Sequence, residues 1–149
     1  IVLALFHVIN YQNNKKNLND FFKNARYHLK PKSILGFDFW YTPAVNFQKP
    51  KIRLSEFKNK NLRIIKLAEP EIIKQKNIVN VKYTIIMNNF FKKTTEVVRE
   101  NHRMKHFSLN DLEKTFKKYK FRCVHLRELI SNKKPSKNTW GVFCLLQKY

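Results

Sequence analysis

Glycine is scarce in this chain of 149 residues, which contains only Gly36 and Gly141. Average usage of about 7% would give roughly ten. Two glycines so far apart cannot form the glycine-rich loop that cradles phosphate groups at the start of a helix. The sequence therefore excludes a phosphate-binding loop of that kind within these residues.

Cysteine and long apolar runs are also scarce. Cys123 and Cys144 are too few for a disulfide scaffold or for a structural zinc site with cysteine ligands. No apolar run reaches the roughly 18 residues that a membrane-spanning helix needs, which excludes a protein built on such helices. Hydrophobic residues still make up 43% of the chain, enough to form a core.

Acidic residues are few, because 10 Asp and Glu face 31 Lys and Arg, and the net charge is +21. A charge of this size suggests a nucleic-acid partner. However, 24 of the basic residues are Lys, whereas base and phosphate recognition favours Arg. The basic runs are short and scattered, and Lys, Asn, Ile, Phe and Tyr all have A/T-rich codons. We therefore interpret much of the charge as compositional drift on a solvated surface.

The first 40 residues predict a βαβ unit. Residues 1–7 and 33–40 are apolar runs typical of buried strands. Between them, apolar residues recur on one helical face over residues 18–29, with Asn17 as the expected cap and Pro31 as the stop. Two buried strands joined by a helix form a parallel pair. Because residue 1 is not Met and already lies in such a strand, we expect a fragment of a longer domain.

The remaining pattern predicts an antiparallel insertion and a closing hairpin. Residues 43–60 are expected to form a loop, and residues 62–68, 78–87 and 94–107 three antiparallel strands with one wet face. Ser108 and Asp111 form a capping box for a second helix. Residues 121–130 and 139–147 are the closing strands. No linker is visible, so residues 1–149 are predicted to be one domain that contains the insertion 62–107.

This order of elements resembles the second half of a class I S-adenosylmethionine-dependent methyltransferase. The segments that carry the likeness are Leu-Phe-His-Val-Ile-Asn-Tyr (5–11), His-Leu-Lys-Pro (28–31), Phe-Asp-Phe-Trp-Tyr (37–41) and Trp-Gly-Val-Phe (140–143). The meander is similar to the substrate-covering insertion of small-molecule methyltransferases, including those that methylate amino sugars. The resemblance implies an α/β fold, namely the C-terminal portion of a Rossmann-like sheet with a three-stranded antiparallel insertion.

The same resemblance implies S-adenosylmethionine as cofactor, a cytoplasmic location and free thiols. The family's glycine-rich loop and its ribose-binding acid would lie upstream of Ile1. The sequence departs from the family pattern in two places, since Lys32-Ser33 replace the usual Gly-Gly after Pro31 and Lys120 stands where the family usually has glycine before the aromatic Phe121. Lys120 is therefore expected to hold a strained left-handed cap before Phe121.

Candidate ligand-binding residues follow the two predicted parallel strands, because ligands of open parallel sheets bind beyond the carboxyl ends of the strands. The resemblance implies that Leu5, Phe6 and His7 line the cofactor pocket. Alternatively, Leu5 and Phe6 belong to the core and His7 is a hydrogen-bonded turn residue. As a catalytic group, His7 would orient or deprotonate a nucleophile. Asp38, inside a buried strand, needs a partner or must point outward.

Polar and aromatic residues at the same strand ends are candidates for substrate contacts. Methyl transfer is an in-line displacement, and holding the reactants in line supplies much of the acceleration. Aromatic faces beside a sulfonium add about 0.5–2 kcal/mol of cation–π stabilisation. We predict a catalytic role for Tyr11 and substrate contacts for Asn10, Trp40 and Tyr41. Ordinary packing remains the alternative for these side chains.

Basic residues on the last meander strand form another candidate group. Alternation places Arg99 and Arg103 on one face and His102 on the other. We predict that the two arginines bind an anionic substrate such as a sugar nucleotide and that His102 is catalytic; a solvated charged face is the alternative. The spacing of His102 and His106 suits a helix, so no metal site is expected. The preferred hypothesis is methyl transfer to a small molecule, and the second is an RNA methyltransferase or basic RNA-binding module. A third is a non-catalytic interaction domain derived from a methyltransferase.

Overall fold

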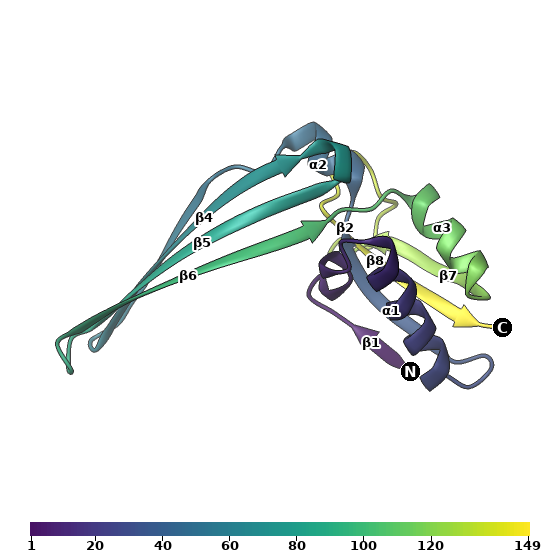
Figure 1. Ribbon diagram of the computed structural model, residues 1–149, viewed down its shortest axis with the longest axis horizontal. Helices are drawn as coiled ribbons and strands as arrows, with labels where there is room; N and C mark the ends of the chain where they lie inside the picture. Colours follow the sequence, from purple (N-terminus) through teal and green to yellow (C-terminus); the bar gives the residue numbers. More distant parts are fainter. The chain divides into compact units, whose positions relative to one another are not determined.

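The computed structural model describes all residues, 1–149, as two compact units. Ile1–Lys49 and Met104–Tyr149 form the first unit, and Pro50–Arg103 form the second. The elements of both are labelled in Figure 1. No helix is long and apolar enough to cross a membrane.

The first unit contains a mixed sheet with strand order β1-β2-β8-β7. Strand β1 (Val2–Ala4) runs parallel to β2 (Ile34–Trp40), and helix α1 (Lys15–His28) connects them. The predicted βαβ unit is thus confirmed. Strand β8 (Gly141–Lys148) pairs antiparallel with β2 and with β7 (Phe121–Glu128), as the predicted closing hairpin requires.

Side-chain caps fix where the two long helices begin. Asn14, rather than the predicted Asn17, caps α1, because its side-chain oxygen accepts a hydrogen bond from the Asn17 backbone N–H at 2.8 Å. Helix α3 (Leu109–Lys118) begins at the predicted cap, since Ser108 Oγ accepts from the Asp111 N–H at 3.2 Å. That hydroxyl also donates to the Asp111 carboxylate at 2.6 Å.

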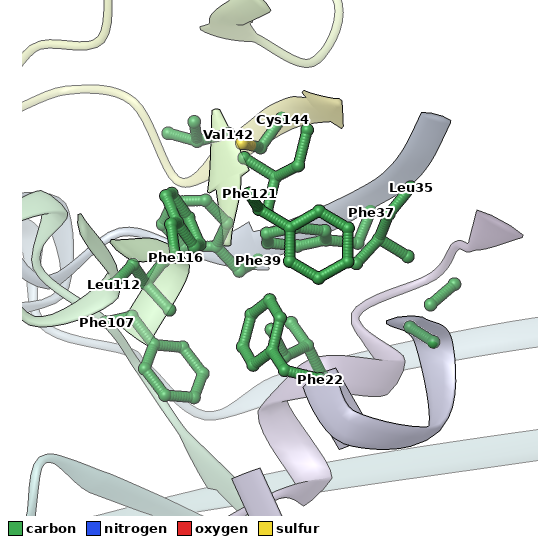
Figure 2. Close-up of a cluster of buried hydrophobic side chains, with 14 of the residues drawn as sticks. Phe22, Leu35, Phe37, Phe39, Phe107, Leu112, Phe116, Phe121, Val142 and Cys144 are labelled. Atoms are coloured by element: carbon green, nitrogen blue, oxygen red, sulfur yellow. The ribbon is translucent and has the colours of Figure 1, made fainter. Parts of the chain in front are cut away.

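Helices α1 and α3 both contribute side chains to one core with the first sheet. Figure 2 shows Phe22 of α1 and Phe116 of α3 gathered against Phe37 and Phe39 of β2, and all four are buried. The Phe22 and Phe37 rings meet edge to face with centroids 6.0 Å apart. Because strand side chains alternate, this inward set sends Asp38 to the opposite face of β2.

The second unit is a four-stranded sheet in the order β3-β4-β5-β6. It comprises β3 (Arg53–Lys58), β4 (Leu62–Ile73), β5 (Ile78–Asn89) and β6 (Thr94–Lys105), with the short η2 helix (Lys74–Lys76) between β4 and β5. Strands β3, β4 and β5 pair antiparallel. The predicted meander strands are therefore present, but the prediction of a three-stranded insertion was wrong.

Two additional elements, α2 and β3, occupy residues 42–48 and 53–58, whereas residues 43–60 were predicted to be a loop. Helix α2 (Thr42–Gln48) has Pro43 in its first turn. Proline is tolerated there, because the backbone N–H that it lacks would have no partner within the helix. All six residues of β3 are exposed, and its apolar residues Leu54 and Phe57 are three apart, so no alternating pattern marks it. Strand β4 also extends through Pro70, which is tolerated because β3 pairs only as far as Ala68 and leaves that edge free.

Candidate active site

The chain turns sharply after β1, at the carboxyl end of the parallel pair. Strand β1 ends at Ala4, and residues 8–11 form a short 3₁₀ helix (η1, Val8–Tyr11) instead of continuing the strand. Phe6 and His7 have φ values of 61° and 62° in succession. Left-handed backbone is costly for side chains of this size, so the surrounding structure must hold the turn.

Leu5 and Phe6 project from this turn into solvent. Their exposed fractions are 39% and 88%, so the interpretation that they belong to the core is wrong. The turn thus presents two apolar side chains beyond the end of β1. This is the edge of the sheet at which open α/β folds bind ligands.

His7 pairs with Asp38, the carboxylate that the sequence placed inside a buried strand. His7 Nδ1 lies 2.6 Å from Asp38 Oδ2, and the His7 backbone N–H donates to the same oxygen at 3.2 Å. Asp38 is 1% exposed, so this contact supplies the partner that its burial demanded. The left-handed backbone at His7 is what allows ring and main chain to converge on one oxygen.

Opposing effects act on the ionisation of Asp38. Burial raises its pKa, whereas the hydrogen bonds from the His7 ring and backbone and the attraction of the His7 ring lower it. The lowering effects win, so the pKa of Asp38 stays below its ordinary value and the carboxylate is ionised at neutral pH. Because Nδ1 of the His7 ring faces this carboxylate, Nε2 is the ring nitrogen left for a ligand. The His7 side chain is 30% exposed, so a ligand can reach it.

Aromatic rings extend this site along the ends of β2 and β8. The rings of His7 and Trp40 lie 5.9 Å apart, and Trp140 meets Trp40 edge to face at the same distance. The Trp140 indole N–H donates to the side-chain oxygen of Gln48 on α2. Trp140 was not among the predicted site residues, although the sequence placed it at the start of the predicted closing strand 139–147, and it directly precedes the observed strand β8.

Asn10 is fully buried beneath this cluster. Its side-chain oxygen accepts from the Trp40 N–H at 3.4 Å, while Nδ2 has no hydrogen-bond partner in the protein. Asp38 Oδ1 likewise has none. Buried polar groups without partners are costly, so a donor and an acceptor here suit a polar ligand. Tyr11, at the end of η1, is 42% exposed.

Tyr41 holds the framework of this region through its backbone, and its side chain is partly exposed. Its N–H donates to the Trp140 carbonyl at 3.0 Å, and its side chain packs against the core. A second buried pair follows it, in which Thr42 Oγ1 lies 2.9 Å from His106 Nδ1. Burial, with a smaller effect of Lys105, lowers the pKa of His106 to about 4, so its ring is neutral at pH 7. Thr42 was not predicted from the sequence as a site residue, and His106 was considered only as a metal ligand.

Arg99, His102 and Arg103 lie on β6 and belong to the second unit, whereas the residues described so far belong to the first. His102 Nε2 is 2.8 Å from the Glu100 carboxylate, and its ring meets Tyr83 edge to face at 5.0 Å. The exposed arginines follow the alternation of the strand. No group of three or more potential metal ligands is assembled anywhere in the chain.

No sequence-family model matches the chain, and no curated protein matches it. Solved structures do match. An S-adenosylmethionine-dependent methyltransferase from Clostridium acetobutylicum superposes with a TM-score of 0.81 and 18% identity, over 98% of this chain and 56% of that one. A sugar N-methyltransferase from a Streptoalloteichus species gives a TM-score of 0.76 and 14% identity, over 99% and 56%.

An amino pentose methyltransferase from Micromonospora echinaspora, solved with S-adenosylmethionine bound, gives a TM-score of 0.73 and 9% identity over 99% of this chain and 57% of that one. The chain thus spans somewhat more than half the length of each of these structures. At such low identities the likeness establishes the fold. The α/β fold resemblance predicted from the sequence is confirmed.

Proposed function

We propose that the protein containing these 149 residues is an S-adenosylmethionine-dependent methyltransferase that acts on a small molecule, with His7 as general base. The observation that carries this proposal is the contact of 2.6 Å between His7 and the buried Asp38, beyond the carboxyl ends of two parallel strands. The methyltransferase fold of its structural neighbours supports the same reaction class. Its cytoplasmic location is part of the proposal.

The turn after β1 fits the cofactor chemically. The cofactor supplies a methyl group carried on a sulfonium, inside a molecule with both apolar and polar parts. Leu5 and Phe6 offer exposed apolar surface, and the His7 ring, whose side chain is 30% exposed, offers a polar group. We assign Leu5, Phe6 and His7 to cofactor binding. The glycine-rich loop of this family is not among residues 1–149, so the proposal concerns the whole protein.

His7 is assigned to proton removal from the acceptor. Its Nδ1 atom lies 2.6 Å from Asp38, so Nε2 is the atom that accepts the proton that an amine or hydroxyl loses as it becomes methylated. The Asp38 carboxylate stabilises the imidazolium that results, as the third member of a nucleophile–base–carboxylate arrangement does. General base catalysis of this kind contributes about 10²–10⁴-fold to a rate. Tyr11 and His102 are proposed as further catalytic groups.

A sugar nucleotide is the acceptor that we propose. Asn10, Trp40 and Tyr41 are assigned to the sugar, because aromatic faces and an amide suit a polar ring. Arg99 and Arg103 of the second unit are proposed separately as anion-binding residues, because a guanidinium group can bind two phosphate oxygens at once. Two structural neighbours are named as sugar and amino pentose methyltransferases, which supports this class of acceptor.

The test measures transfer of labelled methyl groups by the whole protein to a pool of nucleotide sugars and to total RNA, at low and moderate salt. We expect a labelled small molecule, and a loss of about 10²-fold or more in His7→Gln. His28→Gln is the matched control, since His28 is exposed at the end of α1. Labelling confined to RNA, or full activity in His7→Gln, would contradict the proposal.

A further inference from the structure

Two free thiols face each other across the closing hairpin, away from the residues assigned above. Cys123 Sγ of β7 lies 3.8 Å from Cys144 Sγ of β8. Cys123 pairs in register with Leu146, and a β-bulge at Val124 follows. The bulge changes which side chains of β7 point inward, so that Cys123 before it and Leu126 after it both lie on the side of Cys144.

The two thiols differ in access and in acidity. Cys144 is fully buried among the core side chains in Figure 2, whereas Cys123 is exposed. A hydrogen bond with Cys144 lowers the pKa of Cys123 to about 7, against the opposing effects of burial and of Glu113, while the His125 carbonyl contact also lowers it. The pKa of Cys144 is raised by the same sulfur contact and by burial. A reagent from solvent therefore reaches Cys123 before Cys144, and a large fraction of Cys123 is thiolate at neutral pH.

Cys123 lines a hollow of about 880 Å³ at the end of the sheet opposite to the candidate active site. Phe116 and Phe121 supply its apolar surface, and Lys117, Arg122 and Lys148 surround it with one acid, Glu113. The Arg122 guanidinium is held by Gln147 at 2.7 Å. This balance of charge favours a small anionic molecule beside an accessible thiolate.

We propose that Cys123 and Cys144 are a thiol pair that exchanges with a small anionic disulfide, of the kind represented by glutathione disulfide, bound in this hollow. The Cys123 thiolate attacks one sulfur of the small disulfide, whose S–S bond breaks and releases one thiolate. A mixed disulfide then joins Cys123 to the other half.

Cys144 completes the exchange. Its sulfur attacks Cys123 Sγ, and the two sulfurs close from 3.8 Å to the roughly 2.05 Å of a disulfide. The second half leaves as a thiol and takes the proton of Cys144. The two protein thiols are thereby oxidised to one disulfide between β7 and β8, and the small disulfide is reduced to two thiols.

The test uses the reduced whole protein that contains these residues, glutathione disulfide and peptide mapping by mass spectrometry. We expect a Cys123–Cys144 disulfide in the native protein, no adduct in Cys123→Ser, and a lasting mixed disulfide at Cys123 in Cys144→Ser. In the folded native chain, Cys123 should react roughly threefold faster at pH 7 than the thiols of the urea-unfolded chain. The larger thiolate fraction outweighs the lower nucleophilicity of a more acidic thiol.

The charge of the hollow is tested with a matched pair of reagents. Arg122→Gln and Lys117→Gln should slow the reaction of Cys123 with glutathione disulfide but not with the uncharged disulfide of mercaptoethanol. Three results would overturn the proposal. These are a reaction rate of Cys123 that folding does not increase, a mixed disulfide that is never replaced by the Cys123–Cys144 disulfide, and charge variants that react equally slowly with both reagents. None of these readouts depends on methyl transfer, so a failure of the thiol proposal is distinguishable from a failure of the proposed function.

Discussion

Replacing Asp38 by Asn separates the charge of the buried carboxylate from its shape. Asn keeps an oxygen that can accept from the His7 backbone N–H, but it loses the charge that strengthens both contacts. Hydrogen bonds to charged groups contribute about 1.5–3 kcal/mol, whereas neutral ones contribute about 1 kcal/mol. With two contacts to a side chain that is 2% exposed, we expect Asp38→Asn to lower the free energy of unfolding by about 2 kcal/mol at pH 7.

The loss must depend on pH with a defined sign. The folded-state pKa of Asp38 lies below the ordinary value of 3.8, so its contribution to stability is present above about pH 4 and disappears as the pH falls through the folded-state pKa. Urea unfolding curves of the native protein and Asp38→Asn should therefore differ most above pH 5. As the pH falls below about 4 the difference should shrink, and it should vanish once the pH is below the folded-state pKa, because the native side chain is then neutral as well.

Asp20→Asn provides the matched control. Asp20 is half exposed and pairs with Lys16 one turn earlier on α1, at 2.8 Å. Surface pairs of this kind contribute little, so its removal should leave the unfolding curve unchanged. If Asp38→Asn is as stable as the native protein, or if its deficit is the same at pH 3.5 as at pH 7, then the ionised Asp38–His7 contact does not hold this turn.

Other consequences of the structure can be checked directly. Arg26 donates to the carbonyls of Tyr119, Lys120 and Tyr149 at 3.0–3.2 Å, so Arg26→Met should destabilise the fold by about 1–2 kcal/mol in urea unfolding. Lys120→Gly should raise stability by about 0.5 kcal/mol, since φ is 52° there. Loss of the α3 cap in Ser108→Ala should cost about 1 kcal/mol and lower the melting temperature. We also expect binding to nucleic acid to be weak, indifferent to sequence and abolished by moderate salt in fluorescence titrations, because scattered lysines act through counterion release.

Much of the fold follows from local patterns that the sequence displays. The apolar face of α1, the buried run of β2, the alternation of β5 and the Ser108 cap each lie within about a dozen residues, and all four were predicted. Strand β3 could not be predicted from the sequence, because its six residues are exposed and only its pairing with β4 defines it. Helix α2 was missed because proline near a helix start resembles a loop signal.

The candidate site was predictable in its parts but not in its assembly. His7 was recognised by its place after a strand, and Asp38 by the cost of burying a carboxylate without a partner. Their contact depends on the left-handed backbone of Phe6 and His7, and a Phe-His sequence does not predict that conformation. Trp140 and Thr42 join the region through elements that are remote in sequence, and such pairing follows only from the folded chain.

Because glycine is scarce in this chain, other residues occupy the left-handed backbone conformations of the fold. Eight residues have positive φ, none of them glycine, and four are lysines. A fold that needs such conformations thus holds them at an energetic cost of about 1 kcal/mol each, which the core must offset. At Lys120 the conformation only ends a helix, so glycine can replace it without loss. At His7 it aims a ring and a backbone N–H at one buried oxygen, so there the strained turn and the Asp38 contact stabilise each other. This coupling distinguishes the His7 turn from the helix end at Lys120, where no such contact depends on the strained backbone.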